Sequence, residues 1–341
     1  MAAMALPANH RGHGRSHGSH YHVSSPPRRS HASTSMTHSR NEPKALVWML
    51  AGAAIIGTNG IMVELAGTPP TVSAFWRMAF AGAMLLGWVV ASGGWHALTP
   101  RAWGWIAATG AVFAADLWLW HRSILLVGPG LATLLGNAQV FFMALAGVLF
   151  FRERIGPRFL AGLLLAFAGL WLMLGSNWPQ LPPQYRWGVW LGLGTGVCYA
   201  ASNLGLRRSQ REAHADRARP APVAQVLGIA ALVSAVFLGG AAMAEGVAFA
   251  IPSLKSFLVL LALAGFGHCL SWVLISRAMS HLRVALVGLL LLLQPVVAFV
   301  LDVWLFDRAT EPREWLGLAL SLAGIFLAGL KGRSRLPEQP T

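Results

Sequence analysis

Long apolar runs repeat along this chain from Ala45 onward, and short polar breaks separate them. A helix needs ~20 mostly apolar residues to cross the hydrocarbon core of a bilayer. Because lipid offers no hydrogen bonds, backbone polar groups must be satisfied within each segment, which favours helices. We therefore predict an all-α integral membrane protein with ten transmembrane helices, at residues 45–66, 72–92, 102–120, 124–151, 159–176, 187–206, 222–243, 255–275, 283–305 and 314–331.

The composition excludes an ordinary soluble domain. Only 11% of the 341 residues are charged, whereas soluble domains average ~25%. The formal net charge of +14 lies in a tail and in short loops rather than on one folded face. A basic surface that binds nucleic acid would gather this charge. We therefore expect the lipid bilayer, and no nucleic acid, as a partner of this chain.

The chain lacks the sequence patterns of the common metal and catalytic sites. Two cysteines, Cys198 and Cys269, lie inside apolar runs, which excludes a disulfide framework and a four-cysteine zinc site. No phosphate-binding loop, HExxH motif or Ser-His-Asp triad is visible. We expect no catalytic residue, no metal and no cofactor, so the protein is not predicted to be an enzyme.

The positive-inside rule sets the predicted orientation. With the N-terminus in the cytoplasm, most arginines and lysines of the spanning part fall on the cytoplasmic side. Ten spans place both termini there, so we predict a multi-pass protein of the cytoplasmic (inner) membrane. Five basic residues fall outside: Arg122, Arg186, Lys255, Arg308 and Arg313.

Residues 1–44 differ from the rest of the chain, because they are basic, rich in histidine and almost free of apolar groups. Such a segment cannot bury enough apolar surface to fold, so we predict a disordered, solvated tail. The alternatives are metal binding by the histidines and translation that begins at Met36. Residues 332–341 are predicted to form a cytoplasmic C-terminal tail.

The two halves of the chain look like copies. A shift of 155 residues places Gln139 on Gln294, Gly162 on Gly317 and Gly169 on Gly324. Each half has five predicted spans, an odd number, so the halves must lie in opposite orientations. We predict inverted repeats at 45–176 and 177–331, with a substrate site near the membrane midplane between them.

At these residues the chain resembles the drug/metabolite transporter superfamily, in particular its EamA-type transporters. The resemblance rests on the segment Phe151-Arg152-Glu153-Arg154-Ile155, on Gly162, on Ala168-Gly169 and on Arg77 in the second span. Two departures occur, because Arg308 replaces an acidic residue in the second half and Val140 replaces a proline. The resemblance implies transport of a small metabolite, usually export, driven by an ion gradient or by exchange.

Ionisable side chains in the predicted spans are the first candidates for a site. Each costs roughly 2.5–3.5 kcal/mol at a helix centre, so it must face protein or water. Asp116 lies in the third span, and the repeat maps it to Ser271 in the eighth. His268 lies three residues before Ser271, on the same helix face. We predict that Asp116 and His268 approach one cavity and bind substrate or pass a proton; the alternative is a structural hydrogen bond.

Amides and tryptophans supply further candidates. Gln139 and Gln294 occupy equivalent positions in the fourth and ninth spans, and Asn137 lies close to Gln139. We predict that these amides bind substrate, with helix joining as the alternative. Trp118, Trp120 and Trp272 are predicted to line the cavity and stack on the substrate, with simple packing as the alternative.

Other polar residues have structural or gating predictions. Arg77 is expected near the external surface, where it would snorkel to the headgroups or pair with Glu64. Asp302 is expected to cap a helix or form an ion pair at the external end. Asn59 and Asn203, in the first and sixth spans, form another candidate symmetric pair.

The leading hypothesis is a secondary transporter that moves a small metabolite through a central cavity between the repeats. No ATP-binding cassette is visible, so the energy would come from a coupling proton or cation or from exchange. The alternatives are a membrane sensor or scaffold, or a membrane enzyme, with a tail that binds metal or a partner. The substrate, the coupling ion and the oligomeric state are left open by the sequence.

Overall fold

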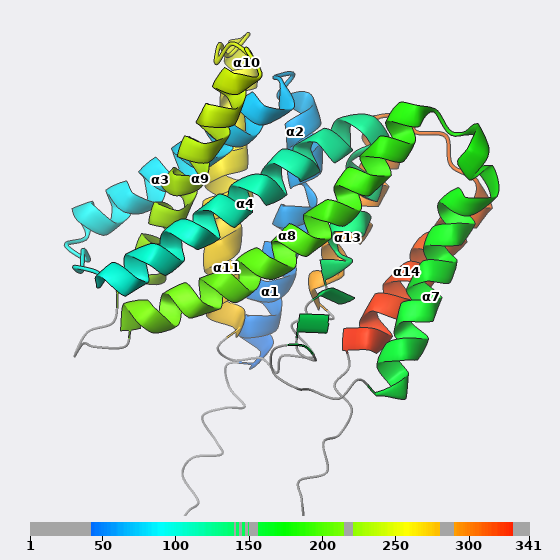
Figure 1. Cartoon of the computed structure of the whole chain (residues 1–341), viewed down its shortest axis with the longest axis horizontal. Helices are drawn as coiled ribbons and strands as arrows, with labels where there is room; N and C mark the ends of the chain where they lie inside the picture. Colours follow the sequence, from blue (N-terminus) through cyan, green and yellow to red (C-terminus); the bar gives the residue numbers. More distant parts are fainter. Residues whose placement is uncertain are drawn as a thin grey trace, which may run out of the picture. The chain divides into compact units, whose positions relative to one another are not determined.

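Helices account for all regular structure in the parts of the chain that the structure describes (Figure 1). The structure, a computed structural model, describes residues 42–139, 141–142, 145–146, 149, 156–214, 221–279 and 290–329. All of them belong to the unit Arg40–Thr341. The predicted tails lie outside the described residues, except that residues 42–44 belong to the first helix rather than to a tail.

Six of the helices in the described part of the chain begin at a proline. Proline suits the first turn of a helix because the N–H group it lacks would have no partner there. The first half contains α1 (Glu42–Gly57), α2 (Asn59–Leu65), α3 (Pro70–Ala91), α4 (Pro100–Val127), α5 (Pro129–Gly136) and α7 (Pro157–Leu174).

The second half repeats this order after a 3-10 helix at Gly175–Gln180. A π-helical stretch, Gly265–Leu270, interrupts the span that is equivalent to α4. The helices of this half are α8 (Pro183–His214), α9 (Val223–Ala244), α10 (Leu254–Ala264), α11 (Ser271–Met279), α13 (Leu293–Leu305) and α14 (Pro312–Gly329).

These helices follow the predicted order of ten spans in two inverted five-helix repeats. Within the described ranges, five segments are long and apolar enough to cross a membrane by length and composition alone. Two shorter helices, Pro157–Met173 and Leu293–Leu305, are also apolar. The five long segments are Pro43–Leu65, Pro70–Ala91, Pro100–Val127, Val223–Ala244 and Leu254–Ile275.

Three predicted boundaries are wrong. The third span ends at Val127 rather than at residue 120, and the fourth begins at Pro129 rather than at residue 124. The break falls at Gly128, whose φ of 85° favours glycine. The sixth span continues to His214 instead of ending at residue 206, because its arginines are good helix formers and Glu212 pairs with Arg208 one turn away.

Helices of the two halves pack against each other. The closest associations join α4 to α8 and α9, α3 to α9, and α1 to α11. The pair α7 and α14 lies side by side at one edge of Figure 1. Because α3 corresponds to α9, and α7 to α14, the repeat axis passes between equivalent helices.

The contact between α7 and α14 is reciprocal. Gly169 lies against the backbone of Gly317, and Gly324 lies against the backbone of Gly162. Gly317 and Gly324 are the repeat equivalents of Gly162 and Gly169, so each equivalent pair exchanges partners across the axis. Small residues allow this close approach of helices in a membrane.

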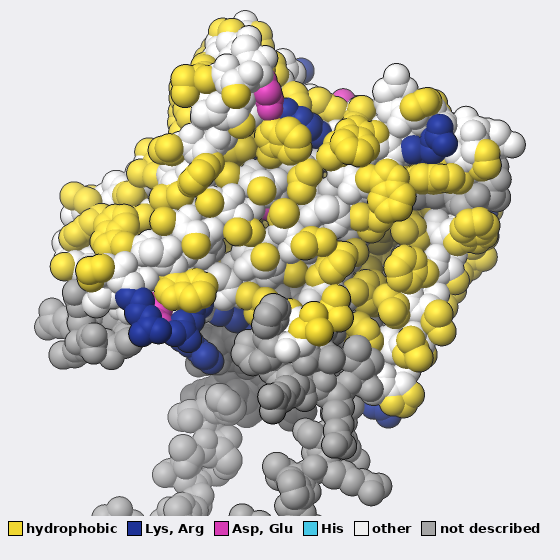
Figure 2. All heavy atoms as spheres, in the orientation of Figure 1, with side chains coloured by type: hydrophobic (Ala, Val, Ile, Leu, Met, Phe, Trp, Pro, Cys, Tyr) yellow, Lys and Arg dark blue, Asp and Glu magenta, His cyan; other side chains and the backbone are white. Residues whose placement is uncertain are grey.

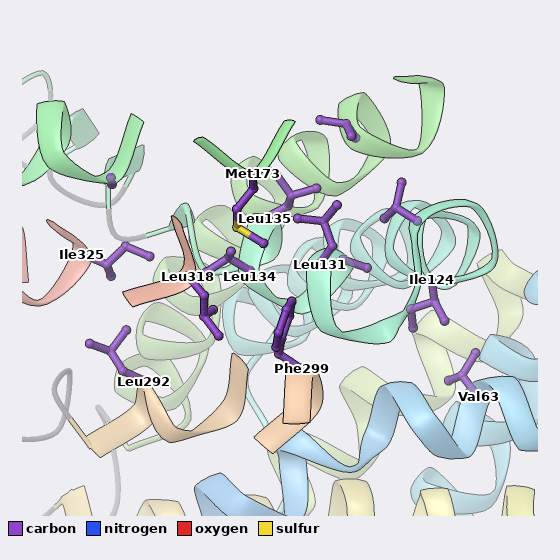
Figure 3. Packing of buried hydrophobic residues seen from close by; sticks show 14 of the residues in the cluster. Val63, Ile124, Leu131, Leu134, Leu135, Met173, Leu292, Phe299, Leu318 and Ile325 are labelled. Atoms are coloured by element: carbon purple, nitrogen blue, oxygen red, sulfur yellow. The ribbon is translucent and has the colours of Figure 1, made fainter. Parts of the chain in front are cut away.

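Apolar side chains both fill the interior and cover the visible outer face. One cluster joins α5 to α13 and α14, with Phe299 packed among Leu131, Leu134 and Leu318 (Figure 3). Figure 2 shows a largely hydrophobic face, with basic side chains toward its upper and lower parts. Large side chains such as Trp88 are 72% exposed. Apolar surface of this extent suits lipid contact.

The α7–α14 contact predicts a stability effect of glycine replacement. A Cβ at Gly324 would meet the backbone of Gly162 and Ala166, so Gly324→Ile should separate the helices and cost about 1–3 kcal/mol. Thermal unfolding in detergent should therefore show a lower Tm. Gly87→Ile is the matched control, because a Cβ at Gly87 meets no atom within 4 Å. Equal effects of the two variants would contradict this packing.

Candidate functional site

A cavity of about 70 Å³, lined by both polar and apolar residues, lies among helices of both halves. One buried water needs a cavity of ~10–15 Å³, so this cavity has room for roughly five groups of that size. Its lining comes from nearly all of the central helices: Ile56, Asn59, Arg77, Phe113, Asp116, Leu117, Trp120, Thr133, Gly136 and Asn137 from the first half, and Thr195, Tyr199, Trp272 and Gln294 from the second.

The acidic and the basic residue of the described cavity lining, Asp116 and Arg77, are carried by neighbouring helices. Pro70 starts α3 and places Arg77 two turns into the helix. Thr99 caps α4 by accepting a hydrogen bond from the Ala102 N–H at 3.2 Å, and the long helix then carries Asp116 into the interior. Arg77 and Asp116 are only 4% and 5% exposed.

Several buried polar atoms around the cavity have no hydrogen-bond partner in the protein. They include Nε and Nη1 of Arg77 and Oδ1 of Asp116. Oδ1 of Asn59 and Oγ1 of Thr133 are also unpartnered. Buried polar groups are nearly always hydrogen bonded, so this concentration at one cavity indicates a site for water or a polar ligand.

The prediction for the surroundings of Arg77 is wrong. Its side chain is buried at the cavity instead of reaching the external headgroups. Arg77 and Glu64 form no ion pair in the structure, and Glu64 on α2 is absent from the cavity lining. The guanidinium carbon of Arg77 lies 5.6 Å from the ring centroid of Trp120, a cation–π contact.

Asp116 and His268 do not share one cavity, contrary to the prediction. His268 lines a second cavity of about 30 Å³. Phe113, Tyr199 and Trp272 line both cavities, so the two cavities adjoin.

The predicted amides divide between two roles. Asn137 and Gln294 line the cavity of Asp116, and both are buried. Gln139 lines neither cavity, and its Oε1 accepts a hydrogen bond from Nδ2 of Asn203 at 2.9 Å. The repeat equivalents Gln139 and Gln294 therefore have different surroundings. Asn59 and Asn203 likewise line different cavities.

Of the predicted tryptophans, Trp120 and Trp272 line the cavity and Trp118 does not. The indole N–H of Trp118 donates to Oε1 of Glu245 at 2.8 Å, and the Arg122 guanidinium lies 3.8 Å from its ring centroid. Nη2 of Arg122 is 2.6 Å from the same Glu245 oxygen. This cluster ties α4 to the end of α9.

Glu245 lies just beyond the end of α9 and is the acidic residue of this cluster. Burial opposes its ionisation, but hydrogen bonds from Thr71 and Trp118 and the charge of Arg122 hold the pKa of Glu245 below its usual value. Glu245 is therefore ionised at neutral pH, and its pairing with Arg122 persists there.

Ion pairs also occur at other helix ends. At the start of α4, Glu212 of α8 is 3.5 Å from Arg101 and 2.6 Å from Arg208. The predicted pairing of Asp302 is confirmed, since its carboxylate lies 3.3 Å from Arg308. The same carboxylate accepts a hydrogen bond from the Gly130 N–H at 3.2 Å. The Asp302 contacts join α13 to α5, whereas Arg101–Glu212 and Arg122–Glu245 join α4 to the second half near both of its ends.

Sequence reasoning missed several residues of this region, among them Thr133, whose unpartnered Oγ1 lies at the cavity. His121 is fully buried, and both of its ring nitrogens lack a partner. It was overlooked because the predicted span ended at residue 120, although the apolar run at 124–127 is compatible with a longer helix. Thr195 and Tyr199 lie four residues apart on α8 and both line the cavity.

Known proteins similar to this chain include transporters. A protein of Escherichia coli (strain K12) named "Probable amino-acid metabolite efflux pump" is 26% identical over 205 residues, which cover 58% of this chain and 66% of that protein. An uncharacterized transporter of Synechocystis sp. is 23% identical over 300 residues, which cover 82% and 86% of the two chains.

A solved crystal structure shares the fold. It superposes with a TM-score of 0.60 at 19% identity, over 84% of this chain and 97% of the other. The model of the EamA-like transporter family matches residues 43–175 and 186–330, one match for each half. The chain therefore belongs to the EamA-like transporter family and is a multi-pass membrane transporter.

Proposed function

We propose that this protein is a secondary transporter that exports a small zwitterionic metabolite of the amino-acid type across the cytoplasmic membrane. The observation that carries the proposal is the pair of buried, oppositely charged side chains, Arg77 and Asp116, whose unpartnered atoms lie at one cavity. Both termini lie in the cytoplasm in this proposal, and an ion gradient or exchange supplies the energy.

The charges of the cavity favour a substrate with one positive and one negative group. Among the described lining residues, Arg77 is the basic residue and Asp116 the acidic one. A purely anionic substrate would leave Asp116 without a partner, and a purely cationic one would leave Arg77 unpaired. An uncompensated buried charge costs several kcal/mol, so a zwitterion satisfies both side chains best.

Each end of a zwitterion finds a suitable partner. The planar guanidinium of Arg77 can donate two parallel hydrogen bonds to a carboxylate. Asp116 can accept from an ammonium group, and Oδ1 of Asn59 and Oγ1 of Thr133 offer further acceptors. Asn137, Gln294 and Trp272 complete the proposed site as polar and aromatic walls.

The direction and the substrate class also draw on a relative. The similar protein of Escherichia coli is named as an amino-acid metabolite efflux pump. A carboxylate such as Asp116 can bind either an ammonium group or a coupling proton, which offers one way to exchange the two. Gln139 has a structural role in this proposal, because it joins α8 through Asn203.

Neutralising Asp116 should abolish export without removing the protein from the membrane. Asp116→Asn keeps the shape of the side chain but removes the charge that binds the ammonium group. We expect export of the substrate, measured by mass spectrometry of the culture medium, to fall at least about tenfold, since losing one partner of a buried charge pair costs ~2–5 kcal/mol. The matched control is Glu311→Gln, because Glu311 is a surface acid 64% exposed. Normal export by abundant Asp116→Asn protein would remove Asp116 from the mechanism.

The charge requirement also predicts which solutes compete. In proteoliposomes that contain the purified protein, amino acids such as alanine should inhibit transport of the labelled substrate. Ethylamine and propionate each lack one of the two charges, so each should inhibit at least about tenfold less well. Equal inhibition by propionate and alanine would overturn the zwitterion assignment while leaving transport itself intact.

Removal of the N-terminal tail separates a transporter from a sensor. A protein without residues 1–35 keeps every described helix, so it should export at the rate of the full chain. Export is compared after correction for the amount of protein in the membrane. Loss of activity at equal abundance would favour a tail that binds metal or a partner.

A further inference from the structure

We propose that the second cavity, which His268 lines, is the subsite for the side chain of the transported metabolite. It would take an uncharged side chain that carries a hydrogen-bonding group. This inference rests on the proposed function, because it places the charged ends of the substrate in the cavity of Arg77 and Asp116.

The two cavities are neighbours within one binding region. Phe113 on α4, Tyr199 on α8 and Trp272 on α11 line both of them. A molecule whose charged groups occupy the first cavity therefore extends past these three aromatic side chains into the second.

His268 brings an unpartnered polar atom to the second cavity. It is 3% exposed, and its Nδ1 has no hydrogen-bond partner. Its ring lies between aromatic walls, with centroids 5.9 Å from Phe113 and 6.4 Å from Trp272. Depending on the tautomer, Nδ1 can donate or accept one hydrogen bond.

The other polar side chains around this cavity already have partners. Oγ1 of Thr109 donates to the Trp105 carbonyl, Oγ of Ser202 donates to the Tyr199 carbonyl, and Nδ2 of Asn203 donates to Gln139. Within the described lining, His268 is therefore the residue with a buried side-chain atom left unpartnered. A ligand atom that bonds to Nδ1 would remove the cost of burying it.

The π-helical turn supports a specialised role for this position. His268 lies inside Gly265–Leu270, where the helix is wider than an α-helix. Ser271 donates its hydroxyl to the Gly267 carbonyl at 2.8 Å, which satisfies a carbonyl in this irregular turn. Such π-turns within helices often occur at functional sites.

The other residues that line this cavity disfavour a substrate with a charged side chain. Leu206 of α8 and Leu227, Ala230 and Ala231 of α9 close the cavity, and its described lining contains no Asp, Glu, Lys or Arg. A charged side chain would be buried here without a partner, at a cost of several kcal/mol. An uncharged side chain with an amide or hydroxyl group fits both the apolar walls and His268.

Filling the cavity tests the subsite. Ala231→Leu adds bulk at the cavity wall, so it should lower the ratio of asparagine to alanine transport at least about tenfold, in line with the effect of steric changes in apolar pockets. Ala235→Leu is the matched control, because Ala235 lies one turn further along α9, is equally part of the same apolar cluster and lines neither cavity. The control should leave the ratio unchanged.

Replacing the imidazole of His268 tests the proposed hydrogen bond between the substrate and Nδ1. This variant also tests the subsite if Ala231→Leu does not fold. Asparagine and leucine have similar shapes but only asparagine can bond to Nδ1. His268→Leu should therefore lower the ratio of asparagine to leucine transport at least about tenfold. A purely structural role of His268 would lower both rates together and leave this ratio unchanged.

The outcomes distinguish this inference from the proposed function. Wild-type protein in proteoliposomes that transports no amino acid at all would overturn the proposed function, and the subsite with it. Wild-type transport of amino acids with unchanged ratios in both Ala231→Leu and His268→Leu would overturn the subsite alone. In that case, water fills the second cavity and the substrate stays in the first.

Discussion

The cost of exposing polar groups to hydrocarbon governs this structure. Backbone groups avoid this cost by forming the hydrogen bonds of helices, and polar side chains avoid it by pointing into the protein. Arg77 and Asp116 are buried with much of their hydrogen-bonding capacity unused. Such a pair is costly unless another group completes its hydrogen bonds, and this requirement connects the helical fold to the proposed transport site.

The inverted repeat supplies the scaffold for that site. Equivalent helices meet across the axis at α3–α9 and α7–α14, where small residues such as Gly169 and Gly324 permit close contact. Clusters at both ends of α4, around Glu212 and Glu245, hold the same helix to the second half. Because both halves line the cavity, movement of one half against the other would change access to it.

Much of the fold could be predicted because its causes are local. Apolar length, prolines at helix starts and the shift of 155 residues indicate ten spans in two repeats without any long-range information. The site was less predictable. Asp116, Asn137, Gln294 and Trp272 were expected at the cavity and line it, whereas other candidates have different partners, such as Glu245 for Trp118.

The sequence by itself determined the helical class, the order of spans and the repeat, since each depends on residues close together or on a constant spacing. Only the tertiary structure decided which polar groups meet: Arg77 lies at the cavity of Asp116 and not beside Glu64, and His268 lines a neighbouring cavity. The physical reason is the rotation of each helix about its own axis. Each residue turns a helix by about 100°, so the packing of neighbouring helices sets which face looks inward.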